Sequence, residues 1–187
     1  PRAPRMTDVT IRPPAGVAEI ERCVALQQEV WGFPDREVVP VSELTSVGLS
    51  GGYLRVAEAP GAGLVGFCFG FWGRASGRAM LYSRMLAVQP AWRGHGLALR
   101  LKSDQRDFTL AAGADRIHWT CDPLVAVNAR LNFGRLGTEC DRYLVDLYGA
   151  RPGTALQLPL GDRPVTVFVR GVWRDYARQF GAVAIDA

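Results

Sequence analysis

Lysine is nearly absent from this chain, which limits what its positive charge can mean. The 187 residues include 22 Lys and Arg against 18 Asp and Glu, a formal net charge of +4. Lys102 is the one lysine, and arginine supplies every other cation. The arginines are spread along the chain rather than clustered, so we expect no nucleic-acid partner. An anionic partner remains an alternative that rests on charge alone.

Histidine and paired cysteines are also scarce. His95 and His118 are the two histidines, and no CxxC pair occurs among the cysteines Cys23, Cys68, Cys121 and Cys140. These counts argue against a structural zinc site, and we expect no metal. The longest apolar stretch, residues 64–73, is too short to cross a bilayer, and no secretion signal opens the chain. The sequence therefore predicts a cytoplasmic protein with reduced thiols and no membrane partner.

The composition is that of a globular domain, with 48% hydrophobic and 21% charged residues. Residues 1–5 precede Met6, and we expect residues 1–7 to be a disordered or vector-derived tail. Residues 8–187 are a suitable length for a single domain.

The first half of the chain changes from helical to strand periodicity. Residues 9–12 predict a strand and residues 17–30 an amphipathic helix that ends at Gly32. A second helix is predicted over 42–47, with Ser42 as its N-cap. Three strands follow, joined by short turns, and form an antiparallel meander. Their predicted ranges are 53–59, 64–72 and 80–88.

The second half of the chain alternates between helical and strand periodicity. It predicts helices over 97–112 and 125–136, closed by Gly113 and Gly137, and a short terminal helix over 173–180. The predicted strands cover 116–121, 142–148 and 164–170. Together these elements indicate an α/β domain with a mixed sheet.

A glycine-rich turn lies between the strand that ends at Val88 and the helix that begins near Leu97. Gly94 and Gly96 allow backbone N–H groups to converge on a helix N-terminus beside Arg93, an arrangement suited to a pyrophosphate. A connector that binds nothing is the alternative. No Gly-Lys-Ser/Thr is present for a Walker loop, and Leu99 breaks a dinucleotide fingerprint starting at Gly94.

The turn fits the pattern R-x-x-G-x-A through Arg93, Gly96 and Ala98, and it resembles the acyl-CoA-binding motif of the GNAT N-acyltransferases. The order of elements is similar to one bacterial branch of that superfamily: the meander, the turn, a helix, Trp-Thr-Cys-Asp-Pro at 119–123 and Asn-rich residues 128–137. The resemblance covers about residues 9–149.

The resemblance implies an α/β (α+β) fold with a mixed central sheet of about seven strands and helices on both faces. The fourth and fifth strands, 80–88 and 116–121, would splay apart. Acetyl-CoA or another acyl-CoA would be the co-substrate, with its pantetheine arm along the fourth strand and its pyrophosphate on the turn. The implied contacts are Leu86, Ala87, Val88, Arg93, Gly94, His95, Gly96, Leu97 and Ala98.

The proton carriers remain open. Phe133 stands where relatives often have a tyrosine acid, so Tyr143 is a candidate, as is unassisted departure of the thiolate. Strand 80–88 has no carboxylate where many relatives place a glutamate. Glu43 and Asp122 are the candidate bases, with solvation and a turn as their structural alternatives, and water could serve instead.

Asn128 and Asn132 have i, i+4 spacing on the predicted helix 125–136 and, with Phe133, are candidates for pantetheine contact. Helix capping is the alternative for Asn128. Trp31, Phe33 and Trp119 are candidates for the acceptor pocket, with core packing as their alternative.

These observations favour an acyl-CoA-dependent N-acyltransferase that acts on a primary amine of a small molecule or a protein, by direct transfer in a ternary complex. The alternative is an acyl-CoA-binding module with weak or no catalysis, serving as a sensor or assembly partner. The sequence leaves a homodimer open.

Overall fold

The computed structural model describes residues 8–121, 126–140, 155–160 and 163–168. The chain divides into two compact units, residues 1–119 and residues 120–187, and each is described here by itself. The predicted tail 1–7, strand 142–148 and helix 173–180 lie outside the described residues.

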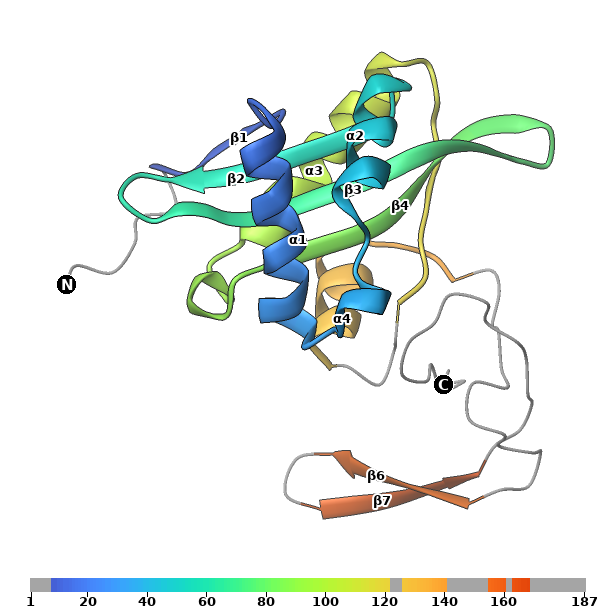
Figure 1. Cartoon of the computed structure of the whole chain (residues 1–187). Helices are drawn as coiled ribbons and strands as arrows, with labels where there is room; N and C mark the ends of the chain where they lie inside the picture. The colour runs from blue at the N-terminus through green and yellow to red at the C-terminus, as the bar shows by residue number, and fades with distance from the viewer. Residues whose placement is uncertain (1–7, 122–125, 141–154, 161–162, 169–187) are drawn as a thin grey trace. The chain divides into compact units, whose positions relative to one another are not determined.

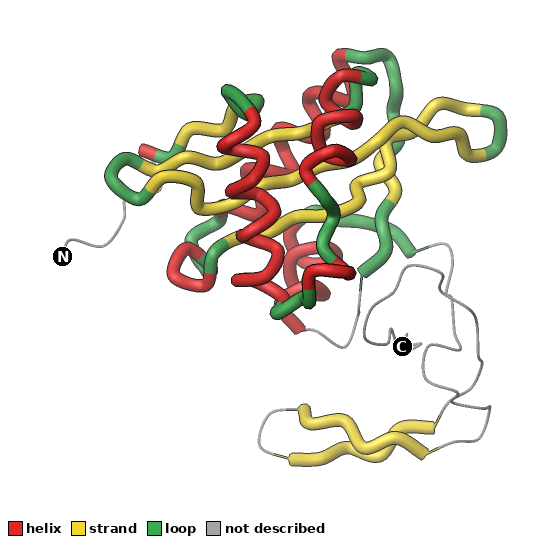
Figure 2. The backbone as a smooth tube through the Cα atoms, in the orientation of Figure 1, coloured by secondary structure: helices red, strands yellow, loops and turns green. Residues whose placement is uncertain are grey.

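The first unit contains a five-stranded mixed sheet with the order β1-β2-β3-β4-β5. Strands are drawn in yellow in Figure 2. Antiparallel pairing joins β1 through β4, as the predicted meander requires, and β5 is parallel to β4. The strands are β1 (Thr10–Arg12), β2 (Tyr53–Ala59), β3 (Gly63–Ala75), β4 (Arg78–Val88) and β5 (Ile117–His118).

Helices cover both faces of this sheet (Figure 1). On one face lie α1 (Val17–Trp31) and α2 (Val41–Leu49), and on the other lies α3 (Leu97–Ala111). Short 3₁₀ turns, η2 (Asp35–Glu37) and η3 (Pro90–Trp92), precede α2 and α3. Apolar side chains form two buried clusters, one with α1 and α2 and one with α3, so the sheet is buried between two helical layers.

The observed ends of α1 and α2 can be compared with the predicted helix caps. Gly32 ends α1 in the left-handed conformation with φ 68°, as expected for a C-terminal glycine. The prediction of Ser42 as the N-cap of α2 is wrong, because the helix begins at Val41 and Pro40 occupies the cap. The Pro40 carbonyl accepts from the N–H groups of Glu43 and Leu44 at 3.1 and 3.2 Å, which places the first turn one residue earlier.

The β3–β4 hairpin is longer than predicted and β5 is shorter. Pairing of β3 with β4 continues to Ala75 and Arg78, around a two-residue turn in which Ser76 and Gly77 both have positive φ. The prediction of a strand over 116–121 is wrong in extent, since β5 covers two residues that pair with Leu81 and Tyr82.

A β-bulge interrupts β4. Phe69 is opposite Met85, but Gly70 is opposite Ser83, so Arg84 is the extra residue. A Cβ at Gly70 would lie 2.5 Å from the Tyr82 carbonyl oxygen, and glycine therefore permits the close approach of the strands here. The bulge reverses the alternation of β4: Leu81 packs in the α3 cluster, whereas Met85 packs in the α1–α2 cluster.

The second unit contains a helix and a hairpin. The predicted helix 125–136 corresponds to α4 (Ala126–Ala129) continued by the π-helical segment η4 (Arg130–Arg135). The predicted strand 164–170 corresponds to β7 (Arg163–Phe168), which pairs with the unpredicted β6 (Ala155–Leu160) in a separate two-stranded sheet. Over the described residues the central sheet has five strands, and the expected strand 142–148 lies outside those residues.

None of the helices that the structure describes is long and apolar enough to cross a membrane.

Candidate functional site

One edge of β4 is open over half of its length. β5 pairs with this edge at Leu81 and Tyr82 alone, while β4 continues to Val88. Over the described ranges, no strand covers the edge between Ser83 and Val88 on the side away from β3. The parallel strands therefore diverge just after Tyr82, and exposed edge N–H and C=O groups follow.

The bulge in β4 determines which backbone N–H and C=O groups of this strand point away from β3. Leu81 donates its N–H to the Arg116 carbonyl on the β5 side at 3.0 Å, and Gln89 donates to the Val65 carbonyl on the β3 side at 2.9 Å. Because N–H direction alternates along a strand, Leu86 and Val88 point their N–H groups to the open edge. The backbone N–H group of Ala87 points toward β3, so it is not available for hydrogen bonding at the open edge.

The glycine-rich turn lies at the end of this edge. After Val88 the chain passes through η3 and then residues 93–96 into α3. Gly94 and Gly96 have φ of 80° and 87°, and Gly96 is the N-cap of α3. An added Cβ at either glycine would meet no other atom within 4 Å, so there is open space beside both residues. Glycine is favoured at these positions because the backbone has a positive φ, and not because a side chain would clash.

The backbone N–H groups from Gly94 to Leu99 are available for a ligand. Arg100 donates to the Gly96 carbonyl at 3.1 Å, and no backbone acceptor for residues 94–99 occurs in the described part of the chain. Converging N–H groups and the positive end of the α3 dipole favour an anion here. This geometry fits a phosphate or pyrophosphate group.

Arg93 links the glycine-rich turn to β4 through a hydrogen bond. Its Nε donates to the Val88 carbonyl at 3.1 Å, and its side chain is otherwise exposed beside the turn. His95 is exposed as well. The Val88 carbonyl is thus occupied, while the Val88 N–H points outward.

Two of the aromatic residues expected around the acceptor pack against each other at the end of α1. The rings of Trp31 and Phe33 stack with centroids 5.3 Å apart, and Phe33 is only 5% exposed within the α1–α2 cluster. Phe33 is therefore a core residue, whereas Trp31 is partly exposed. Glu43 lies in the first turn of α2 and is exposed to solvent.

Five further expected site residues belong to the second unit, residues 120–187. Asp122 and Tyr143 lie outside the described residues. Asn128, Asn132 and Phe133 lie on α4 and η4 in the second unit, where Asn132 is buried and Phe133 is 44% exposed.

Three buried polar residues near the open edge were not predicted from the sequence: Ser83, Lys102 and Gln105. Lys102 of α3 donates to the Ser83 hydroxyl at 2.6 Å and to the Gln105 amide oxygen at 3.2 Å, and its ammonium lies 4.0 Å from the centroid of the Trp119 ring. The available signal was composition: a single lysine among arginines, placed next to Leu101 on the apolar side of a helix.

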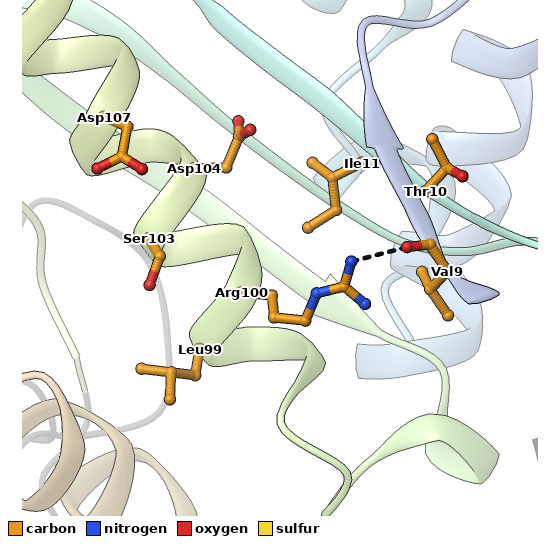
Figure 3. A pocket seen from close by; sticks show the side chains of 8 residues that line it. All are labelled: Val9, Thr10, Ile11, Leu99, Arg100, Ser103, Asp104 and Asp107. Carbon is orange, nitrogen blue, oxygen red and sulfur yellow. Dashed lines mark hydrogen bonds between the residues drawn. The ribbon is translucent and has the colours of Figure 1, made fainter. Parts of the chain in front are cut away.

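A cavity of about 650 Å³ lies between β1 and α3, where Arg100 donates to the Val9 carbonyl at 2.7 Å (Figure 3). Since β1 and β4 are not neighbours in the sheet, this cavity is separate from the open edge of β4. Its lining residues are Val9, Thr10, Ile11, Leu99, Arg100, Ser103, Asp104 and Asp107. Within the described ranges, no group of His, Cys, Asp and Glu side chains is arranged to hold a metal ion.

Comparisons with protein-family models and with curated proteins find no match for this chain. Solved structures do match. An aminoglycoside acetyltransferase from an uncultured soil metagenomic sample, in complex with sisomicin, superposes with a TM-score of 0.61 at 18% identity, covering 76% of this chain and 95% of that one. The chain has the GNAT acetyltransferase fold.

Two further structures with the GNAT fold match over similar lengths. The aminoglycoside N-acetyltransferase AAC(6')-Iy in complex with CoA has a TM-score of 0.59 at 17% identity, with 78% of this chain and 95% of that chain covered. A Trypanosoma brucei acetyltransferase has a TM-score of 0.55 at 17% identity, with 74% and 98% covered. At these identities the likeness shows the fold, and the chemistry must be argued from this chain's own residues.

Proposed function

We propose that this protein is an acyl-CoA-dependent N-acyltransferase that acts on a primary amine of a small molecule or a protein. The proposal rests on two features that follow one another along the chain. They are the open edge of β4 and the N–H groups of residues 94–99 at the start of α3. An extended, amide-containing arm with a pyrophosphate at one end matches both features in order. CoA has this construction.

The turn would hold the pyrophosphate. The N–H groups from Gly94 to Leu99 would donate to phosphate oxygens, with Arg93 beside them and the α3 dipole adding to the attraction. The N–H groups of Leu86 and Val88 would hydrogen-bond the pantetheine arm as a further strand would. Ala87 contributes packing, because its N–H faces β3.

Bound acyl-CoA supplies an activated thioester. In the transfer, the amine nitrogen forms a C–N bond to the acyl carbon as the C–S bond breaks, the electron pair of that bond stays on sulfur, and the amine gives up one proton. An outward N–H of β4 within reach of the thioester oxygen would stabilise the negative charge that develops there. Loss of one such donor typically costs about 3–4 kcal/mol.

The proton from the amine needs an acceptor. Glu43 is exposed on α2, and its carboxylate makes no hydrogen bond or ion pair with another side chain among the described residues. The β4 sequence, by contrast, has no carboxylate. We propose Glu43 and Asp122 as the bases to test, with water as the acceptor if neither acts. Tyr143 is the corresponding candidate for proton donation to sulfur.

The test is amine-dependent release of CoA thiol from acetyl-CoA across a panel of primary amines, with the acylated product identified by mass. Glu43→Gln and Asp122→Asn should lower kcat for whichever residue is the base while the Kd for acetyl-CoA stays unchanged. Glu21→Gln is a matched control, because Glu21 is an exposed helical glutamate on α1. If neither variant slows the reaction, the base is another residue or water.

The second candidate function is an acyl-CoA-binding module with weak or no catalysis. It is favoured by the absence of a carboxylate from β4 and by Phe133, whose ring cannot donate a proton. Calorimetric binding of acetyl-CoA without thiol release for any amine would support this candidate over the enzyme.

A further inference from the structure

A second strand edge is open at the start of β2. The neighbouring strand β1 ends at Arg12, which is opposite Val56, and Pro13 and Pro14 follow it. No strand of the described chain therefore pairs with residues 53–55 on the side away from β3. Proline has no N–H group, so these two prolines cannot extend the ladder of β1 along this edge.

A cavity of about 450 Å³ lies at this edge of β2. Its walls come from the two prolines after β1, from α1, from the second half of α2 with the loop that follows it, and from Phe108 of α3. The volume is within the range of small-molecule sites, which is about 300–1,000 Å³. Because β2 and β4 are not neighbours in the sheet, this cavity is separate from the open edge of β4.

The buried residues that line the cavity are apolar. Ile20, Leu44 and Leu54 are 8%, 0% and 4% exposed. Leu49 also lines the cavity and is 85% exposed, more than any other large apolar side chain among the described residues. An added Cβ at Gly48, another lining residue, would meet no atom within 4 Å, so the backbone of α2 leaves space here. An apolar ligand body would gain from covering these side chains.

Arg55 is the one charged residue that lines this cavity within the described ranges. Its guanidinium lies over the rings of Tyr53 and Phe108, 5.2 and 5.4 Å from their centroids, and Nη1 donates to the Leu54 carbonyl at 3.0 Å. The Asp104 carboxylate is 3.6 Å from Nε, which is too long for a hydrogen bond. Asp104 thus offsets part of the positive charge, while Nη2 has no hydrogen-bond acceptor among the described residues.

The backbone of Leu54 adds a second donor at the same edge. Ala87 points its N–H toward β3, where it is opposite Phe67, so Phe67 and Phe69 point their backbone groups toward β4. Leu54 is opposite Phe69 on β2 and therefore points its own N–H and C=O to the outer edge. The hydrogen bond from Arg55 to the Leu54 carbonyl agrees with this direction. No backbone acceptor for the Leu54 N–H occurs in the part of the chain that the structure describes.

We propose that this cavity binds a small monocarboxylic acid with an apolar body. The body lies against Ile20, Leu44 and Leu54, and the carboxylate accepts hydrogen bonds from Arg55 Nη2 and the Leu54 N–H. A guanidinium suits a carboxylate in charge and geometry, and few polar groups in an apolar wall are typical of small-molecule sites. Binding changes no covalent bond, and the site does not depend on the proposed acyl transfer.

Three ligands that share parts of this structure test the proposal. Octanoate has an apolar chain and a carboxylate, octan-1-ol has the same chain without the charge, and acetate has the carboxylate without the chain. In isothermal calorimetry with the full chain, octanoate should bind about tenfold or more tightly than octan-1-ol, and acetate should bind more weakly still. The proposal is overturned if octanoate does not bind, or if either of the other ligands binds equally well.

Arg55→Met tests the role of the guanidinium. The variant should bind octanoate only as tightly as octan-1-ol, and its Kd for octan-1-ol should be that of the wild type. Asp104 keeps a partner in this variant, because the Tyr53 hydroxyl donates to it at 2.9 Å. Arg106→Met is the matched control, since it removes an exposed cation of α3 that does not line the cavity. A preference for octanoate that survives in Arg55→Met overturns the assignment.

Gly48→Leu tests the cavity itself, and does so even if Arg55→Met fails to fold. Leucine is favoured over glycine in a helix, so the variant should unfold no more easily than the wild type in urea. Its side chain should fill the cavity and abolish binding of both octanoate and octan-1-ol. Ser46→Leu is the matched control, because Ser46 is exposed on the same helix and does not line the cavity. Unchanged octanoate binding in Gly48→Leu overturns the location.

Competition with acetyl-CoA separates this site from the edge of β4, which an apolar acid could enter instead. Saturating acetyl-CoA should leave the Kd for octanoate unchanged, because the two places are separate. Displacement of octanoate by acetyl-CoA would assign it to the β4 edge and overturn the proposal. If acetyl-CoA itself does not bind, the proposed function fails, and the titrations of the two leucine variants still decide whether octanoate binds in this cavity.

Discussion

Replacing Gly96 with alanine should weaken acetyl-CoA binding more than it destabilises the fold. Gly96 is the N-cap of α3 with φ 87°, and its Cβ direction is open to solvent. In the proposed complex, that open space is where phosphate oxygens approach the backbone. A methyl group there would push the ligand away from the N–H groups of residues 94–99.

The expected magnitude follows from two separate costs. An L-residue held at positive φ costs about 1–2 kcal/mol, which lowers the free energy of unfolding. Losing one charge-assisted hydrogen bond to phosphate costs about 1.5–3 kcal/mol more, and that loss appears only in binding. Since about 1.4 kcal/mol is a factor of ten, the Kd for acetyl-CoA should rise about 10- to 100-fold.

Gly113→Ala is the matched control. Gly113 follows the other end of α3, has φ 80°, and would also place a Cβ with no neighbour within 4 Å. Both variants should therefore lose similar stability in chemical denaturation, while calorimetry shows weakened acetyl-CoA binding for Gly96→Ala alone. The reasoning is refuted if Gly96→Ala binds like the wild type, or if Gly113→Ala loses the same affinity.

Three further predictions concern stability and reactivity. Tyr53→Phe removes a buried hydroxyl that donates to the Asp104 carboxylate at 2.9 Å. In urea titrations the variant should lose about 1–3 kcal/mol of the free energy of unfolding, while its affinity for acetyl-CoA stays the same. An unchanged urea midpoint would contradict this prediction. Hydrogen bonds from the Arg12 guanidinium, then from a backbone N–H, lower the pKa of Glu19 from 4.5 to about 2, so the ion pair stabilises the fold above about pH 4.5 and loses its effect as pH falls toward 2. Glu19→Gln should flatten that part of the stability–pH curve, and an identical curve would show that the pair contributes nothing. Burial raises the pKa of the Cys68 thiol to about 11, so iodoacetamide at pH 8 should modify it only after unfolding, as read by peptide mass; rapid labelling of the native protein would contradict its burial.

The backbone of the site could be predicted in part because its signals are local. Gly94 and Gly96 lie between a strand and a helix, and their spacing alone indicates converging N–H groups at a helix start. The meander was predictable from short turns between apolar runs. The extension of β3 and β4 to Ala75 and Arg78 was missed, because charged and small residues at an exposed hairpin tip do not show a strand period.

The parts that the sequence did not reveal depend on contacts between distant residues. The bulge at Arg84 arises from the register of β4 against β3 at Gly70, and one sequence does not contain that register. The burial of Lys102 involves a hydrogen bond to Ser83, 19 positions away, and the sequence does not show that these two residues meet. The predicted strand 116–121 was too long because β5 is limited by where β4 diverges from it, rather than by its own composition.

A crystal structure with acetyl-CoA bound tests the central claim most directly. The account predicts the pyrophosphate against the N–H groups of residues 94–99 and the pantetheine arm hydrogen-bonded to the N–H groups of Leu86 and Val88. Acetyl-CoA bound elsewhere, or an arm that leaves the β4 edge without those bonds, would contradict it.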